Sequence, residues 1–113
     1  MAETHAVAEI AERLRLPDQG ERLAALCSRC KVKRLDLFGS ATTDEFDPDH
    51  SDLDFLAVFE GMKPSDYAKA YFDLREGLLE LFERPIDLLT RAGLKNPHLQ
   101  RRVEAELVNL YVG

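Results

Sequence analysis

The chain has 113 residues, 45% hydrophobic and 32% charged, with a formal net charge of -6 at pH 7, which predicts one domain with a modest apolar core. The acidic balance disfavours sequence-independent binding to nucleic acid, which needs clustered Lys and Arg, and binding to an anionic membrane surface. No stretch approaches the ~20 apolar residues of a membrane span, and the first residues lack the basic start and apolar core of a signal peptide.

The N-terminal segment predicts two helices. Apolar residues recur at helical spacing before Pro17, which indicates a first helix that the proline ends. Asp18 is the expected N-cap of a second helix. Three residues would share the inner face of this second helix: Leu23, Leu26 and Cys30.

Two strands are predicted next, separated by a short helical turn and a loop. The first strand covers about residues 34–38 and ends at Gly39-Ser40. The second strand covers residues 52–59 and is apolar apart from two aspartates. Such a composition suits a strand that is buried on both faces of a sheet.

A long helix, a third strand and a closing helix are predicted in the remainder. Ser65 occupies the expected start of the long helix, Pro85 follows its end, and the third strand covers residues 86–90. Asn96 would cap the closing helix. Four apolar residues would line one face of that helix: Leu99, Val103, Leu107 and Leu110. This alternation predicts an α/β or mixed α+β fold, with a small mixed sheet of three to four strands packed by helices.

Three aspartates in the predicted strands suggest a site for hard cations. Asp52 and Asp54 alternate in the second strand, so their carboxylates would project from one face and repel each other unless a cation lies between them. Asp87 is a lone acid in the third strand. It is either an edge-strand acid that faces water or, if the third strand lies beside the second, a third member of the group. Three carboxylates there would hold one or two Mg²⁺ ions, which bind substrate phosphates as well as carboxylates.

The turn at Gly39-Ser40 adds small, approachable backbone for an anionic ligand. Metal ions beside a phosphate suit an in-line displacement at phosphorus, in which pyrophosphate leaves. The sequence resembles the minimal nucleotidyltransferase (MNT) family of the DNA polymerase β-like nucleotidyltransferase superfamily. The resemblance lies in the Gly39-Ser40 turn, the spacer that separates it from Asp52-x-Asp54, and the later Asp87. The likeness runs from about residue 34 to the C-terminus, and its three motifs agree in order and spacing.

The resemblance implies a nucleotidyltransferase fold in a single domain, with N-terminal helices at residues 1–31 and a catalytic core at 32–113. It implies that Asp52, Asp54 and Asp87 are the catalytic and metal-binding residues, and that Asp87 helps to deprotonate the attacking hydroxyl. Two residues would hold the nucleotide's phosphates: Gly39 and Ser40.

The reaction implied by the resemblance is a Mg²⁺-dependent transfer of AMP from ATP to an acceptor. Many minimal members are antitoxins of a HEPN-domain toxin, so the expected partner is such a toxin or another protein acceptor. A core of this size has little room for an acceptor-binding domain, which also favours a protein that brings its own docking surface. Whether the chain forms a homo-oligomer or a hetero-oligomer is left open by the sequence.

Two alternatives share this fold and site. Relatives commonly carry a basic residue shortly after the Gly-Ser turn, whereas residues 41–45 contain no Arg or Lys. A missing cation near the triphosphate favours an antitoxin without activity that binds a nucleotide or its partner, unless Arg34, Lys63 or Arg84 supplies the charge. The other alternative is a small-molecule nucleotidyltransferase, which differs only in its acceptor.

The cysteines and one acidic loop are not expected to form sites. Cys27 and Cys30 form a CxxC pair without the second pair or spaced His of a zinc site. A redox CxxC opens a helix after a strand, whereas this one closes a helix before a strand, so both thiols are expected to be packing residues. The segment that starts at Asp47 lacks the Gly and Glu of an EF-hand loop. Two cysteines and no signal peptide suggest a cytoplasmic protein.

Overall fold

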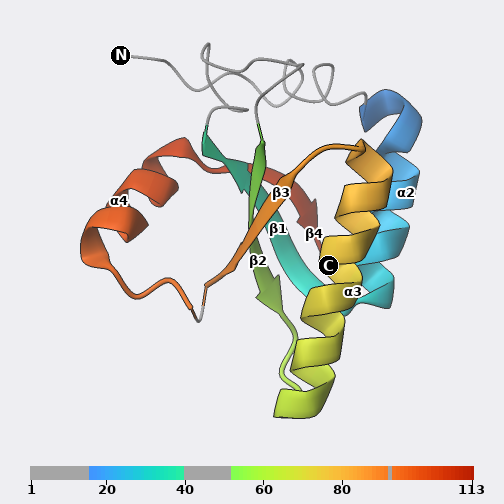
Figure 1. The fold of residues 1–113 in the computed structure, drawn as a ribbon, viewed down its shortest axis with the longest axis horizontal. Coiled ribbons are helices and arrows are strands. Elements are labelled where there is room, and N and C mark those ends of the chain that lie inside the picture. Colours follow the sequence, from blue (N-terminus) through green and yellow to red (C-terminus); the bar gives the residue numbers. More distant parts are fainter. Residues whose placement is uncertain (1–15, 40–51, 92) are drawn as a thin grey trace.

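The computed structural model of the chain describes residues 16–39, 52–91 and 93–113, which form three helices and a four-stranded sheet (Figure 1). The expected first helix, the spacer between the first two strands and Ser40 lie outside these residues. In chain order the elements are α2 (Leu16–Arg29), β1 (Val32–Phe38), β2 (Leu53–Phe59), α3 (Pro64–Phe82), β3 (Ile86–Thr90), α4 (Pro97–Glu106) and β4 (Val108–Val112). None of the described helices is long and apolar enough to cross a membrane.

The sheet is mixed and has the strand order β3-β2-β1-β4. The central strand β1 is antiparallel to β2 and to β4, whereas β2 and β3 are parallel. The predicted sheet of three to four strands packed by helices is therefore confirmed. Strands β1 and β2 occupy the middle of the sheet, where both faces are covered, and this explains why β2 is almost continuously apolar and why the last four residues of β1 are buried.

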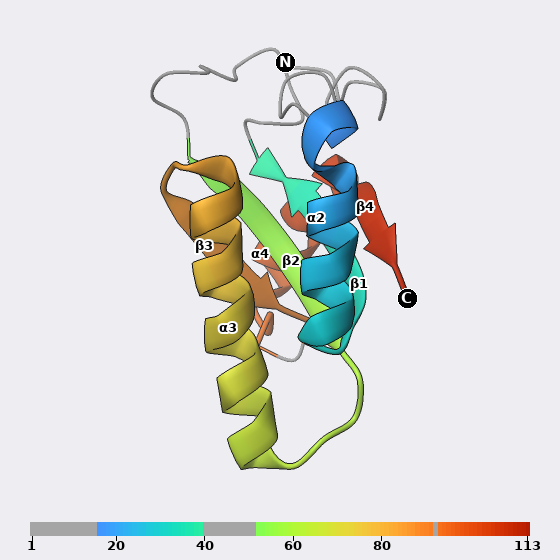
Figure 2. The same cartoon turned by 90° about the vertical axis from the view of Figure 1, so that its right-hand side faces the viewer.

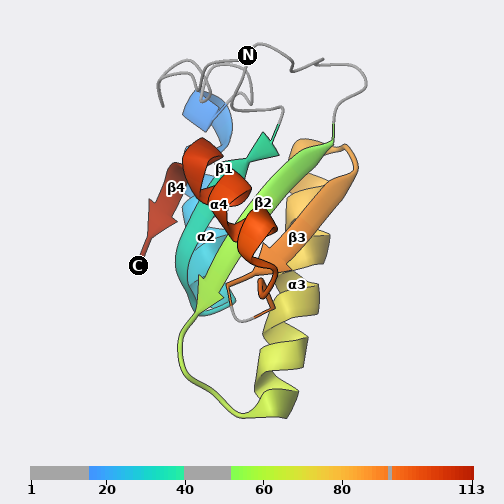
Figure 3. The same ribbon diagram turned by 90° about the vertical axis from the view of Figure 1, so that its left-hand side faces the viewer.

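Helices cover both faces of the sheet. Helices α2 and α3 lie side by side on one face (Figure 2), and α4 lies across the other (Figure 3). The larger apolar cluster joins α2 and α3 to the sheet through side chains such as Leu35 and Phe55, both fully buried. The smaller cluster defines what we call the α4 face, and its buried members are Phe38, Leu56, Leu94 and Val103.

The helix starts differ slightly from the predicted ones. Helix α2 is already helical at Leu16, so Asp18 lies in its first turn and is not the N-cap. Pro17 is tolerated there because N–H groups in a first turn have no intrahelical partner. Helix α3 begins at Pro64, one residue before Ser65, since the fixed φ of proline suits the first helical position.

The predicted closing helix was wrong beyond Glu106. Leu107 is extended, with φ -64° and ψ 131°, and the chain continues as β4 along the free edge of β1. Leu110 is therefore a strand residue and not part of a helix face. Without β4, the outer N–H and C=O groups of β1 would have no partners from the sheet.

Candidate functional site

The sheet ends where β1 finishes and β2 and β3 begin, and we call this edge the carboxylate end. In the parallel register of β2 and β3, Asp54 is the partner of Asp87. Residues two positions further along, Leu56 and Leu89, both pack in the cluster of the α4 face. Because strand side chains alternate, Asp54 and Asp87 project on this same face, level with each other.

The structure bears on both readings stated for Asp87. Strand β3 is an edge strand, and the Asp87 side chain is exposed. The strand also lies beside β2, which places Asp87 next to Asp54. Asp52 is exposed and directly precedes β2, outside the paired residues, while the neighbouring Leu53 N–H donates to Pro85 O at 3.1 Å.

Gly39 brings backbone against the Asp54 carboxylate. It follows β1 with φ +75°, in the left-handed region that favours glycine. A Cβ atom at this position would be strained by this φ and would overlap Asp54 Oδ2, so a side chain here would force the Asp54 carboxylate to move. Phe38, the residue before it, is the register partner of Asp54. Three of the predicted site residues, namely Gly39, Asp54 and Asp87, are thus neighbours at one end of the sheet.

The side chains at the carboxylate end are not gathered into a ready metal site. Within residues 16–39, 52–91 and 93–113, no three His, Cys, Asp or Glu side chains are grouped so that they could hold a metal ion. Carboxylates without a cation between them repel each other, which favours separated rotamers. The donor atoms nevertheless suit Mg²⁺, which prefers carboxylate oxygens.

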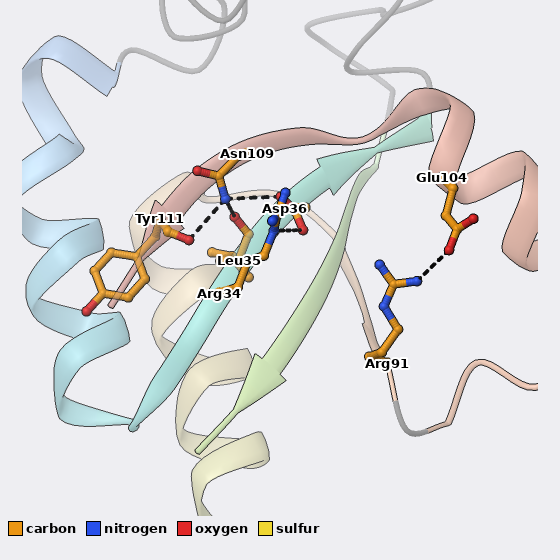
Figure 4. A network of polar contacts seen from close by, with 7 residues as sticks. All are labelled: Arg34, Leu35, Asp36, Arg91, Glu104, Asn109 and Tyr111. Atoms are coloured by element: carbon orange, nitrogen blue, oxygen red, sulfur yellow. Dashed lines mark hydrogen bonds and ion pairs between the residues drawn. The ribbon is translucent and has the colours of Figure 1, made fainter. Parts of the chain in front are cut away.

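A buried carboxylate that the sequence analysis missed lies on the same face. Asp36 is 1% exposed and pairs across β1 and β2 with Leu56, two residues along from the pair of Phe38 and Asp54. Arg34 Nε donates to Asp36 Oδ2 at 2.8 Å, and Asn109 Nδ2 donates to Asp36 Oδ1 at 3.1 Å (Figure 4). The signal was available, since Asp36, like Asp87, is the one acid of its strand and stands between two apolar residues.

Asn109 links this carboxylate to the last strand. The register of β1 and β4 shifts between Leu35 and Asp36, so β4 carries one extra residue there. The Asn109 amide also donates to Leu35 O at 3.4 Å and to Tyr111 O at 3.1 Å, and these two residues form the register pair on the other side of the shift (Figure 4). Every buried side-chain N or O atom of the described residues has a hydrogen-bond partner, and this includes the atoms of this network.

The chain matches the family model described as "Nucleotidyltransferase domain" over residues 21–110. Three relatives from Methanocaldococcus jannaschii, each named "putative protein adenylyltransferase", align over 83 residues, or 74% of this chain and 81% of the relative. They are 32%, 29% and 30% identical to this chain.

Solved structures give a similar result. A protein described as a "putative minimal nucleotidyltransferase" is 30% identical and has a TM-score of 0.64, covering 85% of this chain and 93% of that chain. The toxin-antitoxin structure MntA-HpeT, in a mutant form, has a TM-score of 0.61 at 15% identity, covering 83% of this chain and 73% of that chain. At that identity the second likeness concerns the fold alone.

Proposed function

Because the chain belongs to the nucleotidyltransferase domain family, and within it to the minimal nucleotidyltransferases, we propose that it transfers AMP from ATP to a protein acceptor. The observation that carries this proposal is the register that sets Asp54 level with Asp87, next to the backbone of Gly39. The names of the curated relatives, protein adenylyltransferases by description, support a protein as the acceptor.

In this proposal Asp52, Asp54 and Asp87 hold Mg²⁺. The metal, when bound, would neutralise charge on the triphosphate and on the departing pyrophosphate. An acceptor oxygen attacks the α-phosphorus, the bond from that phosphorus to the bridging oxygen of the β-phosphate breaks, and pyrophosphate leaves. Asp87 is exposed and therefore accessible to the acceptor, so we assign to its carboxylate the proton of the attacking hydroxyl.

Gly39 has a separate part in the proposal. Its missing Cβ lets backbone approach the carboxylate end closely, and the turn that it opens would hold the phosphates of the nucleotide. Orientation of the triphosphate over the aspartates is then the main contribution of the protein, since phosphoryl transfer depends on positioning and charge stabilisation.

The acceptor that we propose is the toxin of a toxin-antitoxin pair, with a HEPN domain. Support comes from the fold that the chain shares with the toxin-antitoxin structure MntA-HpeT. The test mixes the purified chain with Mg²⁺, ATP labelled in the α-phosphate, and the product of the neighbouring gene.

Label should appear on the partner with the wild-type chain and fall at least a hundredfold with Asp54→Asn or Asp87→Asn, because each removes a proposed metal ligand. The matched control is Asp66→Asn, an equal change at an exposed acid in the first turn of α3, which should transfer label normally. If the wild-type chain labels no partner and binds no ATP, the proposed activity is wrong.

A second candidate is an antitoxin that neutralises its partner by binding alone. The absence of Arg and Lys from residues 41–45 favours it, since the triphosphate then lacks a cation from the usual segment. Co-expression with the toxin distinguishes the two candidates. Survival that persists in the double variant Asp52→Asn, Asp54→Asn indicates masking of the toxin, whereas survival that disappears in a folded double variant indicates chemistry.

A further inference from the structure

A nucleotide triphosphate needs more positive charge than this chain places after its Gly-Ser turn. Residues 41–45 contribute no cation, and the chain as a whole carries a net charge of -6. Transition states of phosphoryl transfer are commonly stabilised by Arg or Lys side chains in addition to metal ions. We propose that Arg84, between α3 and β3, supplies this charge and binds the triphosphate. This inference rests on the proposed function, because it assumes that ATP is the ligand.

Position along the strands is the first support for Arg84. Leu53 pairs with Ile86 and donates its N–H to Pro85 O, so the residues just before β3 lie beside the start of β2. Arg84 precedes Asp87 by three residues, roughly 10 Å of extended chain. A long arginine side chain at that distance can contact the outer phosphates of a nucleotide whose reacting phosphate lies at Asp54 and Asp87.

The other two basic residues considered from the sequence lie elsewhere. Arg34 pairs with Val58, four residues along β2 from Asp54, and its Nε is bonded to Asp36. Lys63 is the N-cap of α3 and follows β2, at the opposite end of that strand. Of the three candidates, Arg84 is the one that the fold brings to the carboxylate end.

The backbone around Arg84 is well fixed. Glu83 ends α3 in the left-handed conformation, with φ 53°, and its N–H donates to Leu79 O at 2.9 Å. Pro85 on the other side has a φ fixed by its ring. The Arg84 side chain is half-buried and already has a contact of its own, but a guanidinium carries five N–H donors and can bind a phosphate as well.

The test measures nucleotide affinity by calorimetry, with ATP and AMP as probes, in Mg²⁺ and in EDTA. Arg84→Gln should weaken ATP binding about tenfold or more, and AMP binding much less, because AMP lacks the outer phosphates. Arg84→Lys keeps the charge without the forked geometry and should lie between wild type and Arg84→Gln. Arg75→Gln, the same change on the exposed side of α3, is the matched control and should bind ATP normally.

The inference is overturned if folded Arg84→Gln binds ATP like wild type, or loses AMP as strongly as ATP. If Arg84→Gln does not fold, the ATP and AMP affinities of Arg84→Lys are compared with those of wild type, and the same two results overturn the inference. The outcomes separate this inference from the proposed function. If the chain transfers AMP to a partner but Arg84→Gln binds ATP as tightly as wild type, the role of Arg84 is refuted and the proposed function stands. ATP binding that depends on Arg84 without any transfer supports Arg84 and refutes the activity, and a wild-type chain that binds no ATP refutes both.

Discussion

Asp36 shows how much a single buried charge depends on its partners. Its carboxylate is 1% exposed and has one charged donor, Arg34, and one neutral donor, Asn109 (Figure 4). Burying a carboxylate costs several kcal/mol unless it is paired and hydrogen-bonded. The pair contributes little by itself in such a site, but removing one partner leaves the other with an uncompensated desolvation cost.

Arg34→Gln should therefore destabilise the protein by about 1–3 kcal/mol, as measured by urea unfolding. Adding Asp36→Asn should recover part of the loss, because a neutral amide tolerates burial better than an unpaired carboxylate. The matched control is Arg91→Gln, which breaks the exposed pair of Arg91 Nη1 and Glu104 Oε1 at 3.0 Å and should cost less than about 0.5 kcal/mol. Equal losses in the two single variants would contradict this account of Asp36.

Asp36 and Asp87 also show what the sequence leaves undetermined at single positions. Each is the one acid of its strand and stands between two apolar residues, yet one carboxylate is buried and the other is exposed. The difference comes from strand order, since β1 is central and β3 is an edge strand. Strand order depends on contacts between distant segments, which local sequence does not contain.

At the scale of elements, β3 and the start of α4 were predictable because their signals are local. Strand β3 has the predicted bounds, and Asn96 caps α4 by accepting from the N–H groups of His98 and Leu99. The end of α4 was not predictable in this way. Apolar residues there fit a helical spacing, but Val108, Leu110 and Val112 also fit the period of two of a strand. The free edge of β1, more than 70 residues away along the chain, decides between them.

The CxxC pair at the end of α2 was expected to be a packing pair, and both thiols are buried. Burial, with a smaller effect of the Cys30 charge, raises the pKa of the Cys27 thiol from 9.0 to about 12. The folded state therefore holds this proton more tightly than the unfolded state. The resulting stabilisation is present in full below pH 9 and is lost as the pH rises from 9 towards 12.

The free energy of unfolding should consequently fall more steeply between pH 8 and about 10.5 in the wild type than in Cys27→Ala. Urea unfolding at each pH measures both slopes. The cavity left by the substitution lowers stability at every pH, so only the slopes are compared. Parallel slopes would show that Cys27 does not titrate with a raised pKa.

At the scale of the whole molecule, unequal covering of the two faces leaves the candidate site accessible. Helices α2 and α3 bury one face, whereas on the α4 face Leu56 and Val103 are buried and Asp87 is exposed. The pairing of β2 with β3 was one of the two alternatives that the aspartates left open, and the register decides it. How close the carboxylates lie could not be predicted, because their rotamers depend on charge and on bound cations.

This arrangement predicts that the stability of the whole domain responds to Mg²⁺. In EDTA, Asp87→Asn should melt at a temperature equal to or above that of wild type, because it removes one of several like charges at the carboxylate end. A metal that binds only the folded state adds about 2.7 kcal/mol when present at a hundred times its dissociation constant. Millimolar Mg²⁺ should therefore raise the melting temperature of the wild type by several degrees and that of Asp87→Asn by much less.

Asp66→Asn provides the control for this melting experiment, because Asp66 lies in the first turn of α3, beyond the opposite end of β2. Its response to Mg²⁺ should match that of wild type. A shift that is equal in wild type and Asp87→Asn would mean that Mg²⁺ acts through general screening of the acidic chain. A shift confined to chains that retain Asp87 would mean that this carboxylate is part of the site that holds the ion.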